Sequence, residues 1–143
     1  MPKVRAEWIG EYGLDKHEFY SAYHYAMQYK KWKDKYARLG ANLEPKAVTY
    51  DGVSVQHSPG CGAVEAVAIE RASLLEKMRK VIDAAKEADS EIWEWILKAA
   101  TTEGATYYSL HNPADGSRPL CCGKKMYYDR RRKFYYYLWR KLA

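Results

Sequence analysis

Apolar and aromatic side chains recur every three or four residues along two long stretches of this chain. The first series is Ala22, Tyr25, Tyr29, Trp32, Tyr36, Leu39 and Leu43, and the second is Val64, Val67, Leu74, Met78, Val81, Ala85 and Ala88. This heptad-like spacing puts each series on one face of an α-helix. We therefore expect an all-α protein that contains two long helices, each with an apolar face that another surface must cover.

Local signals suggest where these two helices begin and end. Asp15, followed three residues later by Glu18, predicts a helix start with a capping-box-like pair, and Gly40 predicts the end of that helix. The second helix should span 63–88, with Arg71 as the one polar residue in its series. Two such helices joined by a loop can pack antiparallel as a hairpin, or each can pair with a second copy in a homodimer. The sequence leaves both arrangements open.

The segment 44–62 breaks the helical pattern. Residues 48–55 alternate in character around Asp51 and Gly52, which is a hairpin-turn signal, and residues 57–62 have the composition of a loop. Because a lone hairpin is only marginally stable in water, we expect a loop or a small ribbon here. The N-terminal unit then comprises residues 1–88.

Residues 89–143 form the second expected unit. Asp89 and Ser90 can cap a helix over 91–100, a short helix should follow at 105–110, and 111–119 is a loop. The last helix should cover 120–142. Its predicted core face consists of Tyr127, Phe134, Tyr135, Leu138 and Leu142. A helix, a short helix, a turn and a long basic helix follow the order of a helix-turn-helix unit.

Positive charge is concentrated on this last helix. Between residues 124 and 141 there are eight Lys or Arg and a single acid, Asp129, in a chain whose net charge is +6 and whose pI is about 9.1. Lys124 and Lys125 stand near the helix start, where the helix dipole disfavours cations, so helix stability does not explain them. Contact with a polyanion explains why these two lysines stand there.

The major groove of DNA admits one helix, and the residues near the start of that helix reach the base edges. We expect base contacts from Lys124, Lys125, Tyr128, Asp129 and Arg132, and phosphate contacts from Arg130, Lys133 and Arg140.

Other kinds of site find little support. The three cysteines do not form a CxxC pair and no HxxxH pattern occurs, so we expect no metal site, and no phosphate-binding glycine loop or other cofactor motif is present. We see no catalytic constellation and expect no enzyme activity. The aromatic series 25–36 is better explained by packing than by stacking on single strands. Without a signal peptide or a long apolar window, we expect a cytoplasmic protein that does not enter a membrane.

Several stretches resemble phage regulators of the RinA and ArpU type. They are I-W-E-W-I-L-K-A, T-Y-Y-S-L and R-P-L-C-C-G-K-K-M-Y-Y-D-R-R-R-K-F-Y-Y-Y-L. The last third resembles region 4 of sigma factors, with Met126-Tyr127, Arg131-Arg132 and Phe134-Tyr135-Tyr136 at matching places. Residues 50–71 also resemble the family's loop and central helix, although Pro-Gly-Cys-Gly stands where an Asp-Pro pair is commoner. The resemblance implies an activator of late phage genes in a bacterial host, with double-stranded DNA and RNA polymerase as partners.

A second hypothesis comes from a different class. A small helical interaction or inhibitor protein of a mobile element would use the same basic helix to bind an acidic surface of a host protein. Binding to duplex DNA that weakens steeply with salt would distinguish the two hypotheses.

Overall fold

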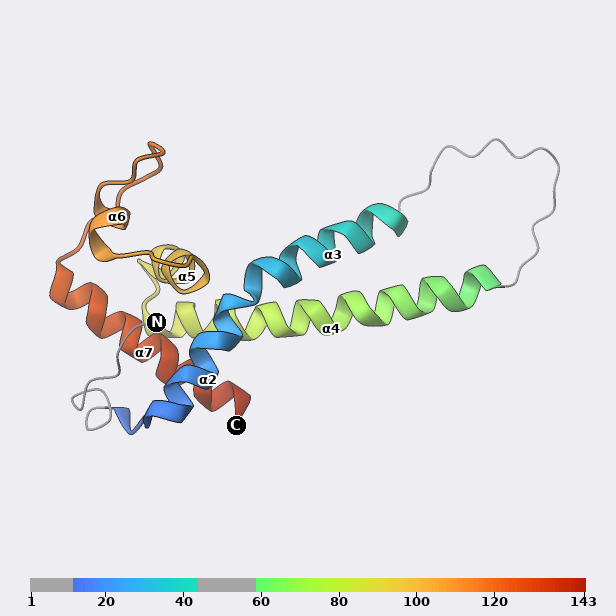
Figure 1. Cartoon of the computed structure of the whole chain (residues 1–143), viewed down its shortest axis with the longest axis horizontal. Helices are drawn as coiled ribbons and strands as arrows, with labels where there is room; N and C mark the ends of the chain where they lie inside the picture. The colour runs from blue at the N-terminus through green and yellow to red at the C-terminus, as the bar shows by residue number, and fades with distance from the viewer. Residues whose placement is uncertain (1–11, 44–58) are drawn as a thin grey trace.

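The computed structural model describes residues 12–43 and 59–143, and within this part every regular element is an α-helix (Figure 1). The helices are α2 (Lys16–Met27), α3 (Tyr29–Leu43), α4 (Pro59–Ala88), α5 (Trp93–Thr101), α6 (Tyr107–His111) and α7 (Lys124–Leu142). The expected all-α class is confirmed. Within these same residues, no helix combines the length and the apolar character needed to cross a membrane.

The first predicted helix is two helices, α2 and α3, which meet at Gln28. Its start is as predicted, because the Asp15 carboxylate accepts a 2.8 Å hydrogen bond from the Glu18 backbone N–H. Its predicted end at Gly40 is wrong, since α3 continues to Leu43. A Cβ atom on Gly40 would lie 2.6 Å from Nη2 of Arg71 on α4. Gly40 therefore makes room for a neighbouring side chain, which a chain-local stop signal cannot reveal.

Helix α3 lies beside α4 and runs in the opposite direction (Figure 1). We call α3 together with residues 59–77 of α4 the arm. Its contacts include a 2.6 Å ion pair between Lys35 and Glu70, and the Arg71 guanidinium 4.0 Å from the centre of the Tyr36 ring. Trp32 is buried. The aromatic series therefore packs against α4, as the helical spacing indicated.

Helix α4 is longer than the sequence pattern suggested. It begins at Pro59, so residues 59–62, which were predicted as loop, are helical. The remainder of the predicted ribbon, residues 44–58, lies outside the described residues. Along α4 the apolar series is buried only from Leu74 onward, whereas Val64 and Ile69 are 55% and 65% exposed.

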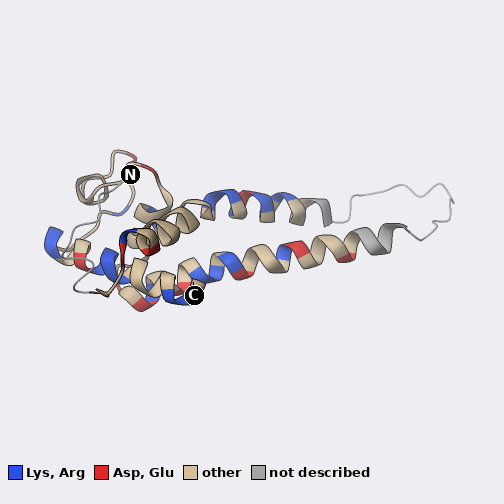
Figure 2. Cartoon of the chain, turned by 60° about the horizontal axis from the view of Figure 1, so that its bottom comes forward, with Lys and Arg blue, Asp and Glu red and all other residues tan. Residues whose placement is uncertain are grey.

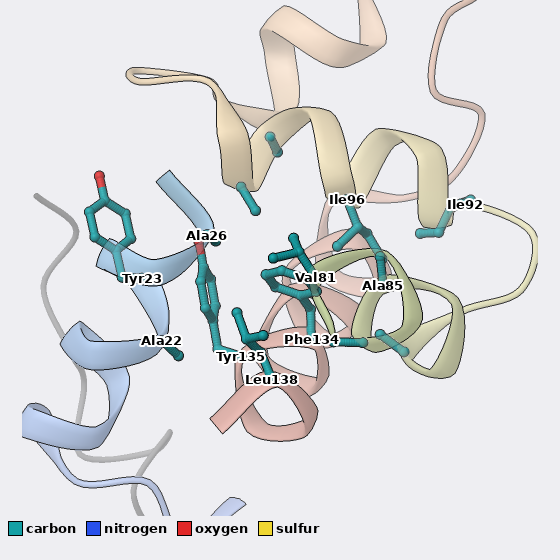
Figure 3. Packing of buried hydrophobic residues seen from close by; sticks show 14 of the residues in the cluster. Ala22, Tyr23, Ala26, Val81, Ala85, Ile92, Ile96, Phe134, Tyr135 and Leu138 are labelled. Atoms are coloured by element: carbon teal, nitrogen blue, oxygen red, sulfur yellow. The ribbon is translucent and has the colours of Figure 1, made fainter. Parts of the chain in front are cut away.

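Outside the arm, the other helices pack around α7. It packs mainly against α4 and α2, with further contacts to α5 and α6. Four of the five predicted core residues, Tyr127, Phe134, Tyr135 and Leu138, are fully buried, and Leu142 is half-buried. Figure 3 shows Phe134, Tyr135 and Leu138 pointing between α2, α4 and α5. The predicted core face of this helix is confirmed.

One core continues across the predicted boundary at residue 88. Ala22 and Val81 come from the N-terminal side of that boundary, and Ile96 and Phe134 from the C-terminal side, yet all four belong to one buried cluster (Figure 3). The boundary itself coincides with the end of α4.

Short segments connect the last three helices. Asp89 accepts hydrogen bonds from the N–H groups of Glu91 and Ile92 at 2.8 and 3.0 Å, so it caps the turn that leads into α5. Helix α7 begins four residues later than the predicted 120. Leu120 is buried instead, and its N–H donates a 2.9 Å hydrogen bond to the carbonyl of Leu110.

Candidate nucleic-acid interface

The first turn of α7 presents two exposed lysines, Lys124 and Lys125. This turn contains no acidic residue, and Gly123 before it provides no side-chain cap. The backbone N–H groups at a helix start carry a partial positive charge, so two cations here destabilise the helix slightly. The same arrangement favours a bound anion, because the helix dipole and both lysines act on it together.

An exposed tyrosine completes this patch. Tyr108, on α6, is 61% exposed, and its ring centre lies 4.9 Å from the ammonium of Lys124. The same ammonium donates a 3.2 Å hydrogen bond to the Tyr108 hydroxyl. The aromatic ring and the lysine thus form one amphipathic surface, a combination that suits stacking and phosphate contact. We call Tyr108, Lys124 and Lys125 the α7-start patch.

Helix α6 positions Tyr108 through its own capping. The Thr106 hydroxyl accepts from the Ser109 N–H, and the Ser109 hydroxyl accepts from the Thr106 N–H, which is a reciprocal capping box. Tyr107 is buried next to it and donates a 2.6 Å hydrogen bond to the Cys122 carbonyl. That bond ties α6 to the residues that lead into α7. The Thr-to-Ser spacing was a signal that the sequence analysis missed.

Three of the predicted base-contacting or phosphate-contacting residues form an internal network. Arg130 pairs with Asp89 at 3.0 Å and with Asp129 at 2.9 Å. Asp129 also accepts a 2.8 Å hydrogen bond from the Tyr12 hydroxyl, and Arg132 approaches it at 3.8 Å. The network links the middle of α7 to the turn between α4 and α5. It gives Asp129 and Arg130 a structural role that the linear sequence did not suggest.

The network also explains the acidity of Asp89. Partial burial raises the pKa of this carboxyl group, but the hydrogen bonds from the Ile92 and Glu91 N–H groups and the adjacent Arg130 outweigh burial, so its pKa lies below the ordinary value. Asp89 is therefore a charged group that stabilises the α4–α5 turn and the middle of α7 at once.

The predicted DNA-contacting residues are thus not equally accessible. Lys124, Lys125 and Arg140 are exposed, whereas Tyr128, Asp129, Arg130, Arg132 and Lys133 are half-buried. Arg140 lies at the other end of α7 and contacts the Tyr136 hydroxyl at 3.4 Å. DNA contact by all eight residues remains a prediction, and the α7-start patch is the part of it that the geometry favours.

A second concentration of basic residues lies on the arm. Lys30, Lys31, Lys33 and Arg38 are exposed on α3. Figure 2 shows Lys and Arg recurring along that helix. Asp34 is the only acid within α3. This basic face of α3 extends away from the α7-start patch (Figure 1). It has no exposed aromatic ring within the described residues.

The described residues contain no group of His, Cys, Asp and Glu side chains suited to a metal ion. Cys121 is exposed and Cys122 half-buried, and both are free thiols.

Comparisons with protein-family models, curated proteins and solved structures found no match for this chain. The resemblance to RinA and ArpU regulators therefore stays a prediction from the residues alone.

Proposed function

We propose that this protein binds double-stranded DNA through the α7-start patch and acts as a phage or prophage transcriptional regulator. The observation that carries DNA binding is the pair Lys124 and Lys125, which are exposed in a helix first turn without any acid. Cations at this place cost helix stability, so a bound anion gives the best physical reason for them.

The arrangement of the last three helices adds support. Helix α5, the short α6 and the long α7 follow one another, and the two lysines at the start of α7 are exposed, whereas the basic residues 130–133 in its middle are half-buried. A helix-turn-helix unit likewise presents the start of its last helix to the major groove. The connection here, residues 112–123, is longer than the usual turn of three or four residues. Near its end, the hydrogen bond from the Leu120 N–H to the Leu110 carbonyl ties this connection to α6. That bond restricts where α7 can begin relative to α6.

The regulatory role rests on the family resemblance. RinA- and ArpU-like stretches coincide with α5, α6 and α7, and they imply an activator of late genes that acts with RNA polymerase. This part of the proposal is tested by selecting bound fragments from the DNA of the source element. A recovered operator near late genes supports it, and recovery of unrelated fragments contradicts it.

Salt dependence tests DNA binding itself. Each neutralised phosphate adds about −0.9 to the slope of log K against log salt, so contacts to three to six phosphates predict a slope of roughly −3 to −5. Replacing both Lys124 and Lys125 with Gln should flatten that slope by about two and weaken binding to every duplex. The measurement is a set of fluorescence-anisotropy isotherms on one duplex at several salt concentrations.

The matched control is the double substitution of Lys31 and Lys33 with Gln. These residues are also exposed lysines on a basic helix, so their substitution removes the same charge from a different place. Equal losses in both double variants would mean that net charge alone drives binding and would refute the α7-start patch. Absence of duplex binding at low salt would refute the proposed function.

One observation favours the alternative, an interaction protein. Val64 and Ile69 are exposed on the arm, and large exposed apolar side chains can serve as contacts for a protein partner. If duplex binding fails in the salt series, the arm is tested by substituting both residues with Ser. Loss of capture of a host protein by that variant would identify the arm as the partner surface.

A further inference from the structure

A cleft of about 810 Å³ opens between α2, the end of α5 and α7. Tyr23 and Met27 of α2 form one wall, and Tyr128 and Arg131 of α7 form another. The turn after α5, which includes Thr102, also lines the cleft. Such a volume is within the usual range of sites for small molecules or for part of a larger ligand.

Arg131 is the unusual residue in this cleft. It forms no ion pair with a carboxylate anywhere in the described residues, unlike its neighbour Arg130, which pairs with two. Its Nε atom is buried without a hydrogen-bond partner. The groups close to it are phenols, with the Tyr135 ring centre 5.8 Å from the guanidinium carbon. A guanidinium that is partly removed from water needs an acceptor, and a phenol is a weak substitute for an anion.

The phenols themselves remain neutral. Burial raises the pKa values of both Tyr127 and Tyr135, and the adjacent Arg131 charge opposes this only in part. Neither hydroxyl has a hydrogen-bond partner of good geometry in the described part of the chain. Arg131 therefore keeps a full positive charge, and no carboxylate in the described part of the chain pairs with it.

Two further cations accompany Arg131. Lys30 lines the cleft, where its ammonium donates a 3.0 Å hydrogen bond to the Thr102 hydroxyl. Lys124 lies on the same stripe of α7, since positions 124, 128 and 131 follow one another on one helical face. Glu103 is the acid that lines the cleft, and it is exposed. The positive groups thus continue from the α7-start patch into the cleft.

We propose that this cleft is a phosphate-binding site in which Arg131 is the principal donor. A planar guanidinium matches two phosphate oxygens, and Tyr128 and Met27 offer an apolar surface beside them for a sugar or a base. The phosphate is either a backbone phosphodiester of bound DNA or the phosphate of a free nucleotide. Only the first of these rests on the proposed function, and in that case the cleft and the α7-start patch contact the same duplex.

Thermal melting of the full chain tests the site. We expect the wild-type melting temperature to rise more with inorganic phosphate than with chloride at equal ionic strength, because phosphate binds the folded state alone. Arg131→Met removes the unbalanced charge while keeping the length of the side chain. It should melt at or above the wild-type temperature in chloride and lose the phosphate-specific rise. Lys33→Met removes an exposed charge on α3, outside both the cleft and the α7-start patch, and should keep that rise.

A second arm identifies the source of the phosphate. A deoxynucleoside 5′-monophosphate and a duplex are each titrated against wild type and Arg131→Met. Loss of duplex affinity by about tenfold or more, with a salt slope flatter by about one, assigns the site to the DNA backbone. An Arg131-dependent response to the mononucleotide without any duplex binding keeps the phosphate site and refutes the proposed function.

The proposal fails if the wild type shows no phosphate-specific rise, or if Arg131→Met keeps it. Duplex binding that is unaffected by Arg131→Met also overturns the DNA form of the proposal and leaves the proposed function standing. If Arg131→Met does not fold, Arg131→Lys retains a charge but loses the paired donors. That variant should show a reduced phosphate-specific rise, and an unchanged rise would contradict the assignment.

Discussion

At the scale of single residues, the polar atoms of the core separate into those with partners and those without. The Tyr107 hydroxyl donates a 2.6 Å hydrogen bond to the Cys122 carbonyl, whereas the buried Tyr127 hydroxyl has no partner in the described residues. Their ring centres are 5.8 Å apart, so the two tyrosines share one environment. The difference between them is therefore one of hydrogen bonding.

This difference predicts opposite effects of the same substitution. Tyr107→Phe leaves the Cys122 carbonyl without its donor and should lower the free energy of unfolding by about 1 kcal/mol. Tyr127→Phe removes a desolvated hydroxyl that has no partner, so stability should stay unchanged or rise by up to about 1 kcal/mol. Urea denaturation of both variants measures this. Equal losses would show that the Tyr127 hydroxyl does form a bond.

Asp89 carries a second prediction at this scale. Asp89→Asn keeps an acceptor for the Glu91 and Ile92 N–H groups but places an amide donor against Arg130, so it should lower stability by about 1 kcal/mol at neutral pH. Asp89→Ala also removes the cap and should cost about 1–3 kcal/mol. Urea denaturation of both variants at neutral pH measures these losses.

The pH dependence of Asp89→Asn follows from the lowered pKa of Asp89. A carboxylate with a lowered folded pKa contributes fully above its ordinary value of 3.8, and the contribution is lost as the pH falls through the folded value. The difference between wild type and Asp89→Asn should therefore shrink in acid. A difference that stays constant down to pH 2 would contradict the ion pair with Arg130.

At the scale of elements, α4 has two unlike halves. From Leu74 to Ala88 one side of the helix is buried in the core, while between residues 64 and 73 no residue is fully buried. Backbone hydrogen bonds open more readily where few apolar contacts must break. The same helix should therefore have a stable inner half and a less stable outer half.

Hydrogen exchange measures this gradient. Amides at 78–88 should exchange at rates close to the global unfolding limit, and amides at 64–73 should exchange much faster at the same pH and temperature. Uniform protection along α4 would contradict the prediction. If that protection depends on protein concentration, a second copy covers the outer half, which is the homodimer that the sequence left open.

At the scale of the whole molecule, α7 connects the two predicted units. The buried cluster contains residues from α2 and α4 as well as from α5 and α7, so one core spans both predicted units. Removing α7 would expose the surfaces that Phe134, Tyr135 and Leu138 now cover. The molecule should behave as one cooperative structure.

Calorimetry of the full chain tests this cooperativity. We expect a single transition whose calorimetric and van't Hoff enthalpies agree. A fragment of residues 1–88 should show little helix by circular dichroism, because isolated helices depend on packing for stability. Two separate transitions, or a well-folded fragment, would support two independent units divided at residue 88.

The sequence by itself determined the class of the fold and the inward faces of its helices. A helical face is set by spacing along the chain, and this is why Tyr127, Phe134 and Leu138 could be placed in the core correctly. Asp15 could be identified as an N-cap for the same reason, since its hydrogen-bond partner is three residues away. These features need no knowledge of what lies across the molecule.

Only the tertiary structure decided how the charges are used. Arg130, Arg131 and Arg132 are consecutive in the sequence, yet Arg130 joins Asp89 across a separation of 41 residues, while Arg131 lines a cleft and pairs with no carboxylate of the described residues. Gly40 looked like a helix end and instead makes room for Arg71. A side chain's partner depends on which distant elements pack beside it, because ion pairs and close approaches form in space and leave no periodic trace in the chain.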